Sequence, residues 1–272
     1  MRRKYLILIL TTILLASTIA YLLISPEERA PVGPGVGKPI PEVDWSRYHD
    51  LLEVEEILMS LCSYRPDLIK LMSIGLSWEG HIIWAVEITD HSSPGPKLGV
   101  LIVGYHHARE RISLEVPLYI AWSLVREASR GRDEAVALLL DQVVFYVVPA
   151  LNPDGLGASE ANPWHRKNLR PVDDDGDGLV DEDPPEDLDG DGAIYMWWNA
   201  TSWGYEGVDN DGDGLVNEDW PGGVDLNRNY GFMWNATGVD SGSPDPHAED
   251  YVGPGPFSEP ETRALKDLVL AH

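Results

Sequence analysis

The sequence is poor in cysteine and in basic residues. Cys62 is the single cysteine among 272 residues, so neither an internal disulfide nor a cysteine-based metal site can form. Lysine and arginine number 20 against 45 aspartates and glutamates, which gives a formal net charge of −25. A protein that binds nucleic acid needs basic surface to displace counterions from phosphate, so this class of partner is excluded. Hydrophobic residues make up 43% of the chain, which is enough for a core and excludes wholesale disorder.

The acidic residues are concentrated in one segment. Residues 171–219 contain 17 aspartates and glutamates and no lysine or arginine. Three units there share the pattern D-x-D-x-D-G, which opens a calcium-binding loop because alternate positions supply oxygen ligands and the glycine allows the turn. The bidentate glutamate that closes an EF-hand is absent, and a solvated acidic loop is the alternative. We expect an acidic insertion at 171–220 that binds Ca²⁺ through Asp173, Asp175, Asp177, Asp187, Asp189, Asp191, Asp209, Asp211 and Asp213.

The amino terminus has the pattern of an export signal or a membrane anchor. Arg2, Arg3 and Lys4 precede an uncharged run, Tyr5–Ile24, whose twenty residues could cross a bilayer as a helix. Basic residues before such a run favour an amino terminus left inside the cell. We expect residues 1–24 to be a signal or anchor and residues 25–44 to be a Pro/Gly-rich tether. Residues 45–272 would then form an extracytoplasmic domain, either secreted or attached to the membrane.

Within residues 45–272, the hydrophobic pattern predicts alternating helices and strands. Helical spacing covers 46–62 and 113–129, and strands are expected at 77–89, 98–105 and 143–148. The apolar run at 98–105 is typical of a strand that is buried on both faces. This order predicts an α/β fold with a mixed, largely parallel sheet flanked by helices.

Polar segments follow the last two of these strands. In open α/β sheets, sites gather where strands end. His107 and Glu110, three residues apart, could supply nitrogen and oxygen ligands to zinc, although a surface loop with a local hydrogen bond is the alternative. Arg166, Asn227 and Arg228 stand beside apolar residues and suggest binding of an anionic ligand, with a structural salt bridge as the alternative.

Together these segments resemble zinc carboxypeptidases of the carboxypeptidase A/B type. Five motifs occur in the order found in that family, namely GYHHARERIS, LNPDG, WHRKNLRP, GVDLNRNYGF and YVGPGPFSEPETRAL. The resemblance covers about Tyr48 to His272. It includes SIGLSWEGHIIWAVEI, in which His81 replaces the usual basic arginine.

The resemblance implies a role for each matching residue. His107 and Glu110 correspond to two of the three protein ligands of a catalytic zinc ion. Arg166 is similar to the arginine that polarises the scissile carbonyl, and Asp225 is expected to brace a ligand or a turn.

Other matching residues concern the substrate. Asn227 and Arg228 resemble the pair that binds the terminal carboxylate, and Arg109 resembles a secondary substrate-binding arginine. The implied function is an exported metallocarboxypeptidase that hydrolyses the C-terminal residue of peptides by means of a zinc-bound water.

The sequence also departs from the family. The third zinc ligand, the tyrosine over the substrate and the general-base glutamate would follow the helix that begins near Ser258, in which Ser258 and Glu261 are expected to form a capping box. That helix has an apolar stripe of Leu265, Leu268 and Val269, and the sequence ends at His272. We therefore expect a partial domain that lacks its carboxy-terminal strands and is inactive alone. A non-catalytic, calcium-dependent binding or surface module on the same scaffold is the main alternative, and a deacylase of related fold is a weaker one.

Overall fold

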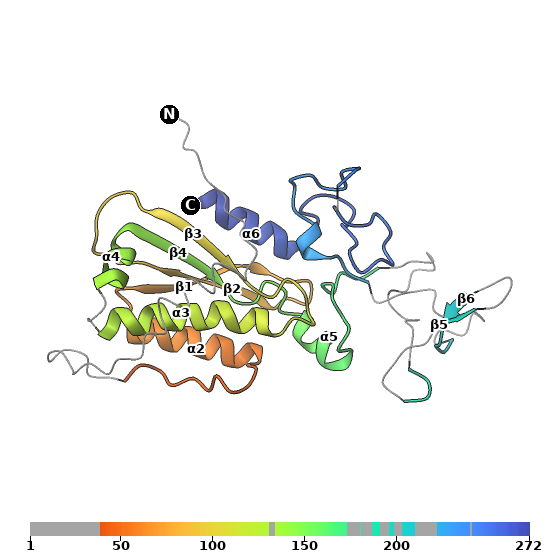
Figure 1. The fold of residues 1–272 in the computed structure, drawn as a ribbon, viewed down its shortest axis with the longest axis horizontal. Coiled ribbons are helices and arrows are strands. Elements are labelled where there is room, and N and C mark those ends of the chain that lie inside the picture. The colour runs from red at the N-terminus through yellow and green to blue at the C-terminus, as the bar shows by residue number, and fades with distance from the viewer. Residues whose placement is uncertain are drawn as a thin grey trace.

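The computed structural model describes residues 39–130, 134–172, 222–239 and 241–272, with short pieces at 180, 187–190, 196–198 and 203–209. A four-stranded sheet lies between α2 (Leu51–Tyr64) and α3 (Ile112–Arg130) on one face and α6 (Pro260–Ala271) on the other (Figure 1). None of the described helices is long and apolar enough to cross a membrane. The run Tyr5–Ile24 and most of the expected tether lie outside the described residues.

The sheet is mixed, as the sequence predicted. Its order is β1 (Ile69–Leu76), β2 (Ile82–Ile88), β4 (Val143–Val148) and β3 (Leu98–Val103). Strands β3 and β4 pair in parallel, whereas β1–β2 and β2–β4 are antiparallel. In the described part, antiparallel pairing therefore outnumbers the parallel pairing that we expected to dominate. One of the two antiparallel pairs comes from β1, which the hydrophobic pattern did not predict: a short turn through Gly80 joins it to β2, and so short a turn permits only antiparallel pairing.

Smaller elements complete the fold. Asp50 caps α2 through a capping box with Glu53, so the helix begins later than the pattern suggested. The remaining elements are α4 (Glu134–Gln142), α5 (Gly155–Ala161), the 3₁₀ helix η1 (Leu226–Arg228) and the strand pair β5 (Met196–Trp198) and β6 (Trp203–Tyr205).

The two faces of the sheet bury two hydrophobic clusters. Along β2, Val86 and Ile88 pack with residues of α2 and α3, whereas Ile83 and Ala85 pack with residues of α6. All four side chains are fully buried. This alternation, in which successive side chains point to opposite faces, is what a strand covered by helices on both sides requires.

Strand β3 is more exposed than its sequence predicted. Leu98 and Leu101 are 69% and 39% exposed, although the apolar run suggested burial on both faces. The physical reason is position, because β3 lies at the edge of the described sheet and has a single neighbour, β4. Hydrophobicity alone does not reveal which strand of a sheet stands at its edge.

Helix α6 begins differently from the prediction. Glu259 is its N-cap residue and Pro260 opens the helix, so the capping box of Ser258 and Glu261 is wrong. Proline suits the first helical position because its ring fixes a helical φ and its missing N–H would have no partner there. Of the expected stripe, Leu265 and Leu268 are buried, while Val269 is 45% exposed.

The exits of β3 and β4 are held together at Gly104. Its N–H donates to Val148 O at 2.9 Å, and its carbonyl accepts from Leu151 N at 3.1 Å. A Cβ at this position would stand 2.0 Å from Ser113 O and 2.8 Å from Pro149 O. The absence of a side chain therefore lets the segments that follow both strands lie side by side.

We expect Gly104→Ala to lower the free energy of unfolding by about 3 kcal/mol or more, because two of the three clashing atoms, Ser113 O and Pro149 O, belong to the backbone and cannot rotate away. Gly157→Ala is the matched control: it lies in α5, and a Cβ added there would meet no atom within 4 Å. The control should be neutral or stabilising by up to about 1 kcal/mol. Urea unfolding of both variants would check this, and equal stabilities would contradict it.

The carboxyl group of Glu261, in the first turn of α6, is buried with few hydrogen bonds to replace those with water. Asn168 Nδ2 donates to Glu261 Oε2 at 3.1 Å, while Glu261 Oε1 has no hydrogen-bond partner among the described residues. Burial raises the pKa of Glu261 to about 7, and the charges of Glu259 and Asp154 add to this effect. Between about pH 4.5 and about 7, the folded protein therefore holds a proton on Glu261 that the unfolded chain has released.

Stability should fall as the pH rises from the ordinary glutamate pKa of 4.5 to about 7, because only the folded state is protonated in that range. Glu261→Gln should flatten this dependence and, above pH 7, stabilise the protein by up to about 3 kcal/mol. Urea unfolding across this pH range measures both effects. Asp267→Asn, on the exposed face of the same helix, should change neither.

Candidate metal centre

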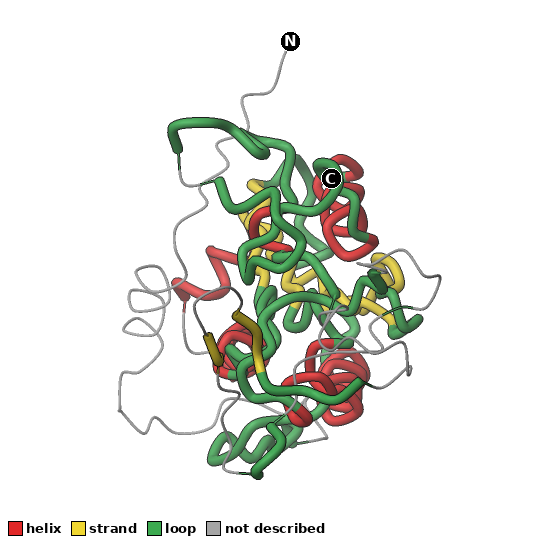
Figure 2. Tube along the Cα trace, turned by 90° about the vertical axis from the view of Figure 1, so that its right-hand side faces the viewer, coloured by secondary structure: helices red, strands yellow, loops and turns green. Residues whose placement is uncertain are grey.

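The candidate site lies where the parallel strands β3 and β4 end. Figure 2 looks onto this end of the molecule, where loops face the viewer. The segment after β3 carries His107, and the segment after β4 carries Asn152. Asn152 Nδ2 donates to His106 O at 3.3 Å and to Lys167 O at 3.0 Å, so one side chain joins three segments of the site.

His107 and Glu110 converge on one point. His107 Nδ1 lies 3.0 Å from Glu110 Oε1, and His107 Nε2 lies 3.0 Å from Asp225 Oδ1. When Nε2 donates its proton to Asp225, the neutral imidazole presents the lone pair of Nδ1 toward Glu110. The separation approaches the roughly 3.3 Å expected between two ligands of one tetrahedral zinc ion. The donor set, an imidazole nitrogen oriented by a carboxylate and a second carboxylate oxygen, fits zinc.

Arg166 lies beside this pair. Its Nε and Nη2 donate to Asp225 Oδ2 at 3.1 and 2.9 Å, and its Nη1 is 3.6 Å from Glu110 Oε1. Its side chain is 16% exposed. A nearly buried guanidinium next to the two candidate ligands can stabilise negative charge that develops there.

Asp225 contacts both the candidate ligand His107 and the neighbouring Arg166. Its side chain is fully buried, and Oδ1 also accepts from Asn227 N at 2.9 Å. Burial opposes its ionisation, but the hydrogen bonds from His107 and Arg166 and the positive charge of Arg166 outweigh burial and lower the pKa of Asp225. The residue braces both a candidate ligand and the turn into η1.

Arg109 pairs with Glu249 rather than with the candidate metal ligands. Its Nη1 and Nη2 donate to Glu249 Oε1 and Oε2 at 2.9 and 3.0 Å, and Nη1 also donates to Trp164 O at 3.0 Å. The structure thus places this predicted substrate-binding arginine in a bidentate ion pair. A substrate would have to compete with Glu249 for the same guanidinium.

Asn227 and Arg228 open onto a cavity next to the site. The cavity has a volume of about 260 Å³ and is lined mainly by apolar and aromatic side chains, among them Tyr230 and Trp234. Arg228 Nε is buried without a hydrogen-bond partner in the described part of the chain. A guanidinium that lines an open cavity is suited to an anionic ligand.

A second histidine beside the candidate ligand stays neutral. His106 Nε2 lies 2.7 Å from the hydroxyl of Tyr230. Burial lowers the pKa of His106 to about 4, and the neighbouring His107 adds to the shift. A neutral His106 avoids a positive charge next to the position where a cation is expected.

The calcium-loop residues are described only in part. Asp187, Asp189 and Asp209 are described, and Asp187 Oδ1 accepts from Gly190 N at 2.7 Å. The other six, Asp173, Asp175, Asp177, Asp191, Asp211 and Asp213, lie outside the described residues. The calcium assignment therefore stays a prediction.

Two buried asparagines that sequence reasoning did not single out hold the motifs in place. Asn168 Oδ1 accepts from Val224 N at 2.7 Å, which fixes the Arg166 segment to the segment that leads into Asp225. Asn229 Nδ2 donates to Val252 O, Gly255 O and Ser258 Oγ. Both lie inside motifs that the sequence identified, but their neighbouring arginines carried the chemical signal.

Asp225→Asn should destabilise the fold by about 3 kcal/mol, because it leaves Arg166 without its anionic partner in a nearly buried position. It should also weaken zinc binding roughly 10- to 100-fold, since the imidazole of His107 loses the carboxylate that orients it. Thermal unfolding and zinc titration measure the two effects. Asp245→Asn is the control, because that side chain is 61% exposed, and an equal loss in both variants would contradict the assignment.

Comparison with known proteins assigns these motifs to a protein family. Residues 54–272 match the zinc carboxypeptidase family. The chain is 35% identical over 124 residues to the inactive metallocarboxypeptidase ECM14 of Ajellomyces dermatitidis, a match that covers 44% of this chain and 21% of that protein. It is 34% identical over 113 residues to carboxypeptidase B of Astacus astacus, covering 42% of this chain and 35% of the relative.

Solved structures agree on the fold. Carboxypeptidase A from Helicoverpa armigera superposes with a TM-score of 0.60 at 21% identity, covering 87% of this chain and 46% of that one. Thrombin activatable fibrinolysis inhibitor gives a TM-score of 0.59 at 23% identity, covering 83% and 44%. The chain thus spans less than half the length of these four relatives. Because the match extends over residues 54–272, this chain belongs to the zinc carboxypeptidase family.

Proposed function

We propose that this chain forms the amino-terminal part of the catalytic domain of a metallocarboxypeptidase that removes the C-terminal residue of peptides. The observation that carries the proposal is the convergence of His107 Nδ1 and Glu110 Oε1 at 3.0 Å, with Asp225 and Arg166 behind them. Family membership supports the hydrolase class.

In this proposal His107 and Glu110 hold the zinc ion, and further groups of the complete domain, including a third ligand and a general base, complete the site. When bound, zinc supplies Lewis-acid polarisation of the scissile carbonyl and activation of water. Asp225 keeps the proton of His107 on Nε2, so that Nδ1 remains a ligand. Arg166, held by the same carboxylate, donates toward the negative charge that develops on the carbonyl oxygen.

Substrate selection falls to Asn227 and Arg228. A free terminal carboxylate accepts hydrogen bonds from the Arg228 guanidinium, whose Nε has no protein partner in the described part of the chain. Anchoring the terminal carboxylate places the last peptide bond, rather than an internal one, next to the ligand pair. The substrate class is therefore a peptide or protein with a free C-terminal carboxylate.

A second candidate function is a non-catalytic binding module. It is favoured by the name of one relative, the inactive metallocarboxypeptidase of Ajellomyces dermatitidis, which is 35% identical to this chain. In either case we propose that residues 1–24 direct export of the chain, which is then either secreted or anchored to the membrane. We also propose that Ca²⁺ orders the acidic insertion 171–220. The motif pattern and the charge distribution of the sequence support these two points.

The test compares two peptides that differ only at the end, one with a free C-terminal carboxylate and one amidated. The complete natural protein loaded with Zn²⁺ should release the last residue from the first and not from the second. Arg228→Gln should lower kcat/KM at least tenfold, which is about 1.4 kcal/mol of transition-state binding, because it removes a charge-assisted contact. Arg130→Gln, an exposed arginine paired with Glu127, is the control and should have no effect.

The two candidate functions give different results. Equal cleavage of the amidated peptide would contradict recognition of the terminal carboxylate. Zinc binding without release from either peptide would favour the non-catalytic module.

A further inference from the structure

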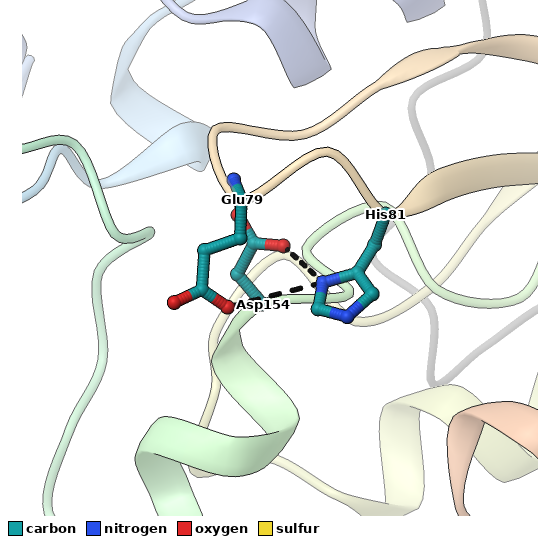
Figure 3. Close-up of side chains that lie close together, drawn as sticks. All are labelled: Glu79, His81 and Asp154. Atoms are coloured by element: carbon teal, nitrogen blue, oxygen red, sulfur yellow. Dashed lines mark hydrogen bonds and ion pairs between the residues drawn. The ribbon is translucent and has the colours of Figure 1, made fainter.

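Three potential metal-ligating side chains meet at a place distinct from the centre at His107. Glu79 and His81 belong to the turn between β1 and β2, and Asp154 stands immediately before α5 (Figure 3). Each offers one ligand atom, and the three atoms lie within 4.8 Å of one another. His81 Nδ1 is 2.8 Å from Asp154 Oδ1 and 3.9 Å from Glu79 Oε2. The set contains an imidazole nitrogen and is therefore more selective for a metal than an acidic patch.

The side chain of Asp154 is buried and held in one orientation. Its side chain has no exposed surface, and its two oxygens accept from the Ser77 hydroxyl and from Glu79 N. Both donors lie in the β1–β2 turn, so this turn and the start of α5 share the carboxylate. Because these two bonds come from groups other than His81, Asp154 remains oriented when His81 changes its partner.

The other two side chains face solvent. Glu79 and His81 have side chains that are about half exposed, and together with Asp154 they line a cavity of about 340 Å³. Asp50 and Glu160 also line it, whereas no lysine or arginine is among its described lining residues. Glu160 pairs with Arg111, and Asp50 caps α2, so Glu79 and Asp154 supply the negative charge that is left for a cation.

The residue at position 81 decides what this cluster can bind. An arginine at this position could pair with Asp154 but would have no lone pair to offer a metal ion. Histidine contacts Asp154 through Nδ1, and the same nitrogen becomes a metal ligand when its proton is lost to solvent. We propose that Glu79, His81 and Asp154 bind a Zn²⁺ ion separate from the one expected at His107 and Glu110.

Bound there, the ion joins the β1–β2 turn to the start of α5. Water completes the coordination, because two of the three side chains are open to solvent. The role of the site is to stabilise the fold, and the proposal does not depend on the proposed peptidase function.

Equilibrium dialysis against Zn²⁺ tests the site, in excess Ca²⁺ so that all-oxygen sites are filled by the harder cation. The whole chain should bind one more zinc ion than His81→Arg, whose new guanidinium retains the pairing with Asp154. Zinc should also raise the melting temperature of the wild type more than that of the variant. His247→Arg, a half-exposed loop histidine near Asp245, is the matched control and should bind as many ions as the wild type.

Glu79→Gln provides a second test of zinc binding at this site if His81→Arg folds poorly. It changes a half-exposed side chain and should weaken zinc binding at this site at least tenfold. Equal zinc stoichiometry in the wild type and His81→Arg would overturn the proposal. An equal loss in His81→Arg and His247→Arg would also overturn it, because binding would then reflect histidines in general.

Discussion

The site depends on a single buried carboxylate, that of Asp225. It accepts hydrogen bonds from His107, from Arg166 and from the backbone of Asn227, and it has no exposed surface. Burying one negative charge is costly, but an arginine and an imidazole at hydrogen-bond distance offset that cost. The same contacts fix the imidazole so that Nδ1 points at Glu110. Charge compensation in the interior and orientation of a candidate metal ligand therefore come from the same contacts.

The fold supports that interaction by bringing three distant segments to one edge of the sheet. Parallel pairing of β3 and β4 places the residues after both strands together, and Gly104 allows their backbones to approach. Asn152 and Asn168 then fix the Arg166 segment to both neighbours through backbone groups. Buried asparagines suit this task because an amide both donates and accepts, so it satisfies backbone groups that irregular segments leave unpaired.

The molecule also places buried charge away from the candidate centre. Glu259, Glu261 and Asp154 are all buried, yet they differ in the hydrogen bonds and charges that offset the cost of burial. Glu259 accepts from Arg170, Trp78 and Asn168, whereas Glu261 has one oxygen without a partner in the described part of the chain. Asp154 is held by the β1–β2 turn. A buried carboxyl group is thus an ion-pair partner in Glu259, an acid with a raised pKa in Glu261 and a potential metal ligand in Asp154, according to its surroundings.

The sequence by itself determined the family, the order of the motifs and the positions of most helices and strands. Periodicity and motif identity are local properties, so β4 and the His107–Glu110 pair could be predicted from them. Tertiary structure alone decided that β1 adds antiparallel pairing, that β3 stands at the edge, and that Arg109 faces Glu249. It also decided that Glu261 is a buried acid rather than a helix cap. Each of these depends on which distant segment lies opposite a residue, and no pattern along the chain contains that information.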